Sequence, residues 1–388
     1  MVEWKKLGDI MQIVRGASPR PIKNYITSNI NGVNWIKIGD VAPGAKYVTR
    51  CNEKITKEGA DKSRYLHAGD FILSNSMSFG RPYILKIDGC IHDGWIAMSD
   101  YAKSVSSGYL YEILNSNSVQ DYWKMKANNG GAMTNLNSDI VRDTIIPIPS
   151  LSEQQRIVGI LDTFIASIDN LKEQIAQRRK QYEYYRDQLL DLEGKPGVEM
   201  KTLGEVFDTR NGYTPSTSNE QFWEGGTIPW FKMEDIRDNG RILYDSYLHI
   251  TPMAVKGKGL FKANSIILAT SATIGEHALI LVDYLCNQRF TNFFPKEKYT
   301  QSIEMKYVYY YMFIIDEWCK QHVNQGGFAS VDMAGLYNMS FPIPSFQEQQ
   351  RIVSILDTFE ASIQNLEAQL KQREKQYEYY RNKLLTFE

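Results

Sequence analysis

Two stretches of the chain share an apolar repeat whose steps alternate between four and three residues. Such an alternation, sustained over several heptads, is typical of the seam of a coiled coil. The sequence therefore predicts two long helices, each burying one apolar stripe. The predicted seam residues are Ile157, Leu161, Phe164, Ile168, Leu171, Ile175, Tyr182, Tyr185, Leu189 and Leu192 in the first stretch and Ile352, Leu356, Phe359, Ile363, Leu366, Leu370, Tyr377, Tyr380, Leu384 and Phe387 in the second.

One step of seven in each stretch passes over an arginine, Arg178 in the first and Arg373 in the second. Each arginine could extend its stem along a loose seam and keep its charged end in water. Alternatively, each could fix the register of the helices or bind a carboxylate of a partner. The pattern leaves both interpretations open.

The two stretches are copies of one sequence. Residues 153–164 read EQQRIVGILDTF, and residues 348–359 read EQQRIVSILDTF, 195 positions later. Prolines precede both copies and exclude a helix upstream, and Ser150 or Ser152 can cap the first helix. Because the link at 193–199 is short, an antiparallel pair is favoured, with the flanking segments at opposite ends and a near twofold axis.

The segments before the two copies also correspond to each other. WIKIGD at 35–40 aligns with WFKMED at 230–235. Both segments contain short β-like runs, among them 93–100 and 265–273, and each has a predicted helix before the repeat, at 118–128 and 305–323. The predicted fold class is α+β, with two similar α/β domains separated by a two-helix antiparallel coiled coil in a pseudo-twofold internal repeat. The predicted parts are a first domain at 1–150, a helical region at 151–193, a second domain at 194–345 and a helical region at 346–388.

Composition and charge narrow the class of protein only modestly. The chain of 388 residues has a formal net charge of −1, so bulk charge gives no support for nucleic-acid binding, which depends on local clustering. The four cysteines have no CxxC spacing, which argues against a zinc site or a disulfide framework. The most apolar stretch, 265–286, is interrupted by charged residues and does not predict a membrane span. We expect a cytoplasmic protein with reduced thiols.

Motifs of catalysis are absent from the sequence. It has no GxxxxGK[ST], no GxGxxG and no HExxH, and its five histidines lie far apart. No catalytic residue and no metal ligand are therefore assigned. Two domains on a helical scaffold without a catalytic constellation predict a binding protein.

The phrase IPIPSLSEQQRIVGILDTF, followed by a long helix and then repeated, resembles the specificity subunit (HsdS) of type I restriction–modification systems. The resemblance covers the whole chain, and CNQRF at 286–290 and the pair KLGDI and TLGEV at 6–10 and 202–206 also resemble the family. The first half has IHDGW at 91–95 where the second has CNQRF. This departure argues against equivalent DNA contacts at that place.

The resemblance implies a non-catalytic subunit that binds double-stranded DNA with a bipartite target. Each domain would read one half, and the helices would hold the halves apart. Two methyltransferase subunits would dock on the scaffold, and restriction subunits with motor and nuclease activity would join them. S-adenosylmethionine, ATP and Mg²⁺ are expected on those partner subunits, and no cofactor is expected on this chain. The alternatives are a two-headed coiled-coil adaptor that binds proteins rather than DNA, and an enzyme with an unrecognised site in the domains.

DNA contact needs Arg or Lys for phosphates and Arg, Asn, Gln, Ser or Thr for base edges, held on loops. Four loop regions in each half meet this need, and the glycines in them allow close approach of the backbone. The predicted DNA contacts are Arg15, Ser18, Arg20, Lys23, Lys37, Asn75, Ser76, Ser78, Arg81, Asn128, Asn129, Gly130, Gly131, Arg210, Asn211, Tyr213, Thr214, Lys232, Thr270, Ser271, Thr273, Gln288, Arg289, Asn324, Gln325, Gly326 and Gly327. The near-identical helix starts suit two identical partner subunits. The predicted partner contacts are Glu153, Gln154, Arg156, Glu348, Gln349 and Arg351.

Overall fold

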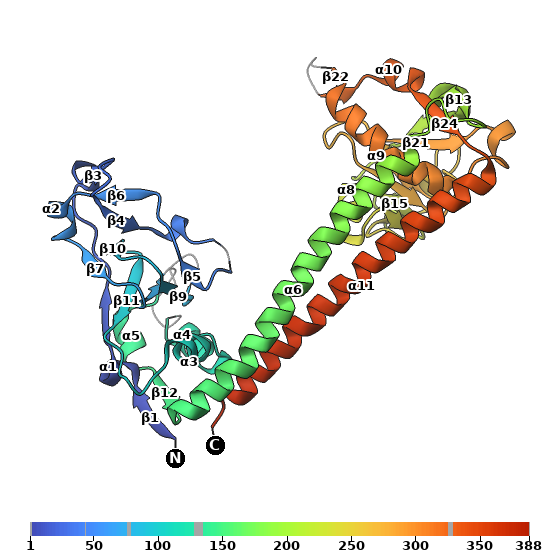
Figure 1. Cartoon of the computed structure of the whole chain (residues 1–388). Coiled ribbons are helices and arrows are strands. Elements are labelled where there is room, and N and C mark those ends of the chain that lie inside the picture. The colour runs from blue at the N-terminus through green and yellow to red at the C-terminus, as the bar shows by residue number, and fades with distance from the viewer. Residues whose placement is uncertain (1, 43, 76–78, 128–134, 325–328, 388) are drawn as a thin grey trace. The chain divides into compact units, whose positions relative to one another are not determined.

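The computed structural model describes residues 2–42, 44–75, 79–127, 135–324 and 329–387 (Figure 1). The chain forms two compact units, one of residues 1–173 with 367–388 and one of residues 174–366. Each unit contains one α/β domain and parts of both long helices.

The domain of the first unit contains two five-stranded sheets. In one sheet, four neighbouring strands are antiparallel to one another, and the fifth strand pairs in parallel at one edge. Its order is β2 (Gln12–Arg15), β11 (Trp95–Ser99), β8 (Phe71–Ser74), β9 (Pro82–Leu85) and β5 (Tyr47–Val48). The other sheet has the order β3 (Ile26–Thr27), β6 (Glu53–Ile55), β4 (Val33–Ile36), β10 (Gly89–Ile91) and β7 (Arg64–Leu66).

Helices cover the first of these sheets and join it to the long helix. The helices are α1 (Leu7–Ile10), α3 (Ser107–Leu114), α4 (Asn117–Ala127) and α5 (Ser138–Arg142), whereas α2 (Lys57–Ala60) packs against the other sheet. β1 (Glu3–Lys6) pairs with β12 (Ile145–Ile148), which directly precedes the long helix α6 (Leu151–Leu190). Trp123 and Tyr109 share one core with Ile157 and Leu161 of α6 and with Leu385 near the C-terminus. The first turns of α6 are therefore part of the domain core.

The second unit repeats the first sheet in the same order and with the same directions. Its order is β14 (Phe207–Asn211), β21 (Phe290–Pro295), β18 (Ser265–Ala269), β19 (His277–Ile280) and β16 (Ile242–Leu243). A three-stranded sheet of β17 (His249–Ile250), β15 (Ile228–Phe231) and β20 (Leu285–Cys286) takes the place of the second five-stranded sheet. The remaining elements are β13 (Glu199–Thr202) paired with β24 (Ser340–Ile343), β22 (Val323–Asn324) paired with β23 (Ser330–Val331), α7 (Leu203–Val206), α8 (Met233–Asn239), α9 (Met305–Gln321) and α10 (Met333–Asn338).

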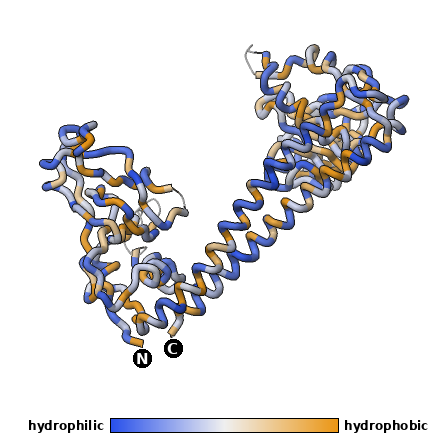
Figure 2. Tube along the Cα trace, in the orientation of Figure 1, coloured by the Kyte–Doolittle hydropathy of each residue, from blue (hydrophilic) through white to orange (hydrophobic). Residues whose placement is uncertain are grey.

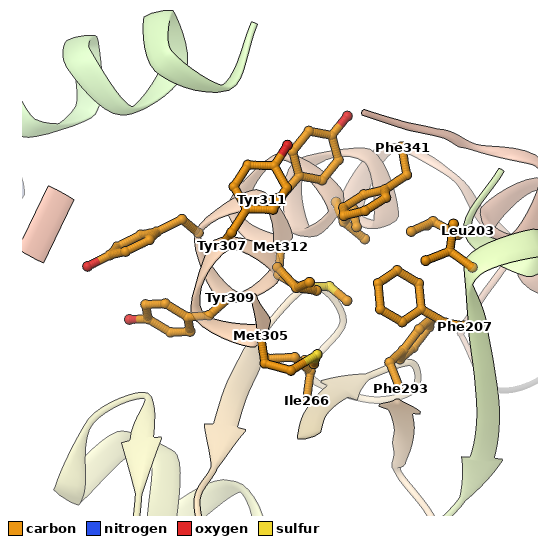
Figure 3. Packing of buried hydrophobic residues seen from close by; sticks show 14 of the residues in the cluster. Leu203, Phe207, Ile266, Phe293, Met305, Tyr307, Tyr309, Tyr311, Met312 and Phe341 are labelled. Atoms are coloured by element: carbon orange, nitrogen blue, oxygen red, sulfur yellow. The ribbon is translucent and has the colours of Figure 1, made fainter. Parts of the chain in front are cut away.

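Helix α9 organises the core of the second unit. Figure 3 shows Tyr307 and Tyr311 of α9 beside Phe341 of β24, with Leu203 and Phe207 nearby. The same cluster contains Leu190 of α6 and Ile352 and Leu356 of α11 (Phe346–Leu384). The predicted helices at 118–128 and 305–323 correspond to α4 and α9, whereas α3 was not predicted.

Both long helices are antiparallel to each other within each unit. In the first unit, Phe164 stacks on Tyr380 at 5.4 Å, and Lys172 lies 3.9 Å from Glu374. In the second unit, the Tyr182 hydroxyl donates a hydrogen bond to Glu360 at 3.1 Å. Leu190, which comes later in α6, shares a core with Ile352, which comes earlier in α11, as expected for antiparallel helices. Figure 2 shows hydrophobic residues recurring between hydrophilic ones along both helices. The predicted fold class is confirmed.

The ends of the predicted seam need correction. Helix α6 ends at Leu190 and α11 ends at Leu384, so Leu192 and Phe387 lie beyond the helices. Leu190 and Leu385, which the periodicity did not select, are only 2% and 4% exposed. Each contacts the core of its own unit, because the last helical turn meets a domain rather than the other helix.

The two seam arginines contact aromatic rings across the helix pair. The guanidinium carbon of Arg178 lies 5.9 Å from the ring centre of Phe359, and that of Arg373 lies 5.7 Å from the ring centre of Phe164. Both positions thus form the same cation–π contact, once in each unit. Such a contact specifies which residue of the other helix lies opposite, and this favours the register interpretation.

Candidate nucleic-acid interface

A polar groove of about 690 Å³ lies at one edge of the first sheet of the first unit. Strands β2 and β8 end at this edge and β11 begins there, because β11 is antiparallel to both. The topology thereby gathers residues that are far apart in the sequence. The lining residues are Arg15, Asn75, His92, Asp93, Gly94, Ile96, Asn135, Leu136, Asn137 and Ser138.

Asp93 connects the loops of this groove. Its carbonyl oxygen accepts hydrogen bonds from Arg15 Nε at 3.0 Å and from Asn75 Nδ2 at 3.1 Å. Its carboxylate accepts a bond from the Ser18 hydroxyl at 2.9 Å and lies 3.0 Å from Nε2 of His92. Burial raises the pKa of this carboxyl, but the Ser18 hydroxyl and the charges of His92 and Arg15 outweigh burial and lower the pKa. Asp93 is therefore an ionised acceptor on the groove wall.

The second unit builds the same backbone frame. Asn75 N donates to Gly94 O at 3.2 Å in one unit, and Thr270 N donates to Arg289 O at 3.0 Å in the other. The Thr214 hydroxyl donates to Gln288 Oε1 at 2.5 Å, as the Ser18 hydroxyl does to Asp93. One frame therefore presents an acid in the first unit and an amide in the second.

A glycine fixes the approach of the first loop in both units. A Cβ on Gly16 would lie 2.2 Å from the carbonyl oxygen of His92, and one on Gly212 would lie 2.2 Å from that of Asn287. Only glycine fits at these two positions. Gly16 and Gly212 are therefore structural counterparts, one residue out of step with the spacing of 195 found in the sequence.

Arg15 and Arg210 are 195 positions apart in the sequence, yet they are not structural counterparts. Arg15 pairs with Ile96 of β11, and Asn211 pairs with Thr291 of β21. Ile96 and Thr291 hold the same place in the repeated sheet, so Asn211 is the counterpart of Arg15. Arg210 instead places its guanidinium carbon 3.9 Å above the Phe261 ring. Its two terminal nitrogens donate to carbonyl oxygens of the chain at 2.7 and 3.0 Å. Arg210 is thus engaged in packing, although it lines a separate groove of about 500 Å³ with two lysines.

Several other predicted contacts also have structural roles. Lys37 Nζ donates to Glu53 at 2.6 Å. The Tyr213 hydroxyl donates to Ala254 O at 3.0 Å. The Thr270 hydroxyl lies 3.0 Å from that of Thr291, and Ser271 forms a β-bridge with Ser330. The side-chain bonds of Lys37, Tyr213 and Thr270 leave less of each of these side chains available for DNA.

The remaining predicted contacts differ in exposure, or lie outside the described residues. Those with an exposed side chain are Arg20, Lys23, Arg81, Arg289 and Asn324, and those partly exposed are Lys232 and Thr273. The predicted contacts Ser76, Ser78, Asn128, Asn129, Gly130, Gly131, Gln325, Gly326 and Gly327 lie outside the described residues.

The groove also contains residues that the sequence did not single out. His92 and Asp93 belong to the phrase IHDGW, whose difference from CNQRF was visible but was not interpreted as a contact. Asn135 is the first described residue after position 134, and Asn137 caps α5 by accepting a bond from Ile140 N at 2.9 Å. Amide, carboxylate and guanidinium groups on one concave surface supply the donors and acceptors that base edges need.

Two of the predicted partner contacts face inward. Gln154 and Gln349 are fully buried. The amide of Gln349 donates to Ser302 O and Pro344 O, both at 2.9 Å, and accepts a bond from Glu304 N at 2.9 Å. The expectation that these glutamines face a partner is therefore wrong, because each one bonds its helix to its own domain. The ion pairs Glu153–Arg156 and Glu348–Arg351 lie at the surface, and their contact with a partner subunit stays a prediction.

Exposed tyrosines mark both copies of the sequence QYEYYR. Tyr184 and Tyr185 are 61% and 48% exposed, and their counterparts Tyr379 and Tyr380 are 59% and 40% exposed. One ring of each pair stacks on a phenylalanine of the other helix. Large exposed aromatic side chains are enriched in protein interfaces. The same surface therefore occurs twice on the scaffold.

Neither metal binding nor membrane insertion is indicated by the described residues. Within them, no group of three or more His, Cys, Asp or Glu side chains could hold a metal ion. In the same ranges, every helix is too short or too polar to cross a bilayer.

Comparisons with known proteins agree on one family. The model of the type I restriction modification DNA specificity domain matches residues 1–178 and 196–374. The EcoprrI specificity subunit of Escherichia coli is 47% identical over 216 residues, covering 52% of this chain and 53% of that protein. The EcoR124I/EcoR124II specificity subunit of Escherichia coli is 39% identical over 263 residues, covering 62% of this chain and 63% of that protein. The chain thus spans between about half and two thirds of the length of these two relatives.

Two solved structures share the fold over nearly the whole chain. The first comes from work on the structural basis of complex assembly and conformational transition of the type I R-M system. It has a TM-score of 0.73 at 18% identity, covering 99% of this chain and 97% of that chain. The HsdS subunit from Thermoanaerobacter tengcongensis has a TM-score of 0.56 at 18% identity, covering 99% and 95%.

Proposed function

Since this chain belongs to the family of type I restriction–modification DNA specificity proteins, we propose that its two domains read the two halves of a bipartite DNA target. Its relatives are specificity subunits, which are the non-catalytic subunits of type I restriction enzymes. The proposal accordingly assigns this chain recognition and assembly, and assigns catalysis to partner subunits.

The shared frame with different side chains carries the proposal. The same backbone bonds hold the loops of both domains, and the pair Ser18–Asp93 is replaced by the pair Thr214–Gln288. A shared frame holds the corresponding loops of each domain in the same way. Different donors and acceptors on that frame suit two different base sequences. A protein-binding adaptor would need no such matched loops with different polar side chains.

The repeated helix surface supports two identical partners. Both copies of QYEYYR expose a tyrosine pair, and both helix starts carry the same exposed ion pair. The proposed partners are two methyltransferase subunits, joined by restriction subunits with motor and nuclease activity. S-adenosylmethionine, ATP and Mg²⁺ would be bound by those subunits. The proposed location is the cytoplasm.

The helix pair would set the distance between the half-sites. Helix α6 contains 40 residues. At a rise of 1.5 Å per residue such a helix is about 60 Å long, which corresponds to roughly 18 base pairs of DNA. An unread spacer between two short half-sites is the expected form of the target.

The experiment is methylome sequencing of cells that express the chain with its methyltransferase partner. The expected result is one methylated motif with two specific parts and an unspecific spacer of constant length. Purified complex should enrich the same motif from a random duplex library. If no motif is methylated and no duplex is enriched, the proposal is wrong.

A further inference from the structure

Arg15 is held in the groove by one end of its guanidinium group. Its Nε donates to the carbonyl oxygen of Asp93 at 3.0 Å, while its side chain is exposed. Within the described residues, neither Nη1 nor Nη2 of Arg15 forms a hydrogen bond or an ion pair. The group is therefore oriented by the protein, and two parallel donors remain for a ligand.

The surroundings of Arg15 suit a base edge better than a phosphate. The ionised carboxylate of Asp93 and the amides of Asn75 and Asn135 line the same groove. A carboxylate repels phosphate oxygens, but it can accept a hydrogen bond from an amino group of a base. Arginine with two free parallel donors matches O6 and N7 of guanine.

The second domain has no arginine at the equivalent position. The strand register places Asn211 there, and its Oδ1 accepts a bond from the Thr291 hydroxyl at 2.9 Å. Arg210, the arginine nearest in sequence, is bonded to Lys258 O and Gly259 O. The two domains therefore differ at this position in charge and in number of free donors.

We infer that Arg15 is a specificity-determining residue that reads a guanine in the half-site of the first domain. The inference rests on the proposed function. The half-site of the first domain contains a G·C pair that depends on Arg15, and the half-site of the second domain contains no pair read by Arg210.

Two substitutions test the inference in the complex with the methyltransferase subunits. Arg15→Gln removes the positive charge and the parallel pair of guanidinium donors, and Arg15→Lys keeps the charge but lacks the planar pair. Selection from a random duplex library reports preference at every base pair. Both variants are expected to lose roughly 10- to 100-fold of preference for guanine at one position of one half-site. The other half-site should keep its preference.

Lys23→Gln is the matched control, since Lys23 lies on the same segment after β2 and its side chain is exposed. It removes the same charge without touching the groove lining, so it should weaken binding evenly across sequences. If Arg15→Gln keeps the full guanine preference, or if Arg15→Gln and Lys23→Gln have the same even effect, Arg15 does not read a base and the inference is wrong. A wild-type complex that enriches no motif would instead contradict the proposed function.

Discussion

The side-chain amide of Gln154 donates a hydrogen bond to the carbonyl oxygen of Ser104 at 2.7 Å. It also donates to Pro149 O at 2.9 Å and accepts a bond from Ser106 N at 2.8 Å. A single buried side chain thus satisfies three backbone groups and joins the first turn of α6 to the loop before α3. Gln349 does the same in the second unit.

Replacing Gln154 by Leu should destabilise the first unit strongly. The change leaves three buried backbone groups without this partner, and each unsatisfied group costs about 1–3 kcal/mol before relaxation. We expect the free energy of unfolding to fall by about 2–4 kcal/mol in urea titrations. The neighbouring Gln155, which is exposed, provides the control, and Gln155→Leu should change stability by less than about 0.5 kcal/mol. Equal effects of both variants would contradict the bridging role.

The contact between Arg373 and Phe164 should be measurable as a coupling. A double-mutant cycle with Arg373→Leu and Phe164→Leu is expected to give about 0.5–1 kcal/mol of coupling free energy in denaturant unfolding. The cycle of Arg178 and Phe359 should give a similar value, because the distances are 5.7 and 5.9 Å. Additive effects in both cycles would mean that the arginines are only solvated in the seam.

Glu112 should make the stability of the first unit depend on pH. Burial raises the pKa of its carboxyl above 4.5, although the Tyr377 hydroxyl, which donates to it at 2.8 Å, acts in the opposite direction. A raised pKa in the folded state means that the stabilising contribution is complete below about 4.5 and is lost as pH rises through the folded pKa. Lys46 and Arg381 face the same group and limit this loss.

The variant Glu112→Gln keeps an acceptor for Tyr377 and removes the titration. We expect thermal unfolding at pH 8 to show a more stable variant than wild type, and at pH 4 to show little difference. A variant that is less stable than wild type at pH 8 would show that the ionised carboxylate is favourable in this setting.

The exposed tyrosines should decide how many methyltransferase subunits bind. Tyr184→Ala and Tyr379→Ala are each expected to weaken one of two docking sites by at least about tenfold, as for interface anchors. Mass photometry should then show complexes with one methyltransferase subunit in place of two. Tyr244→Ala is the control, because Tyr244 is 68% exposed but lies in the second domain rather than on a helix. Full assembly with both helix variants would refute this docking surface.

Removal of one heptad from each long helix, at opposite positions of the antiparallel pair, should shorten the spacer of the DNA target. Seven residues correspond to about 10 Å of helix and to about three base pairs. Methylome sequencing is expected to show unchanged half-sites with a shorter spacer, or no methylation. An unchanged spacer would show that the helices do not set the distance.

The sequence predicted the features that depend on local repetition. Steps of four and three residues were sufficient to place Ile157 and Ile352 on buried helix faces, and the repeated phrase predicted both the paired fold and the family, which are confirmed. Helix α3 escaped this approach because it has only eight residues, which are too few for the periodicity to repeat. The ends of the seam were placed wrongly because the last turns of the helices pack on a domain.

The sequence by itself therefore determined the two helices, the duplication and the family, because these are written in short-range periodicity and near-identical phrases. Only the tertiary structure decided that Asn211, and not Arg210, stands where Arg15 stands. The pair KLGDI and TLGEV is spaced by 196 residues and the pair WIKIGD and WFKMED by 195, so the sequence leaves the register at Arg15 open. Strand pairing fixes it, since a slip of one residue turns every side chain to the other face of the sheet. The structure likewise brought Arg15, Asn75 and Asp93 together, because the ends of three strands meet at one edge.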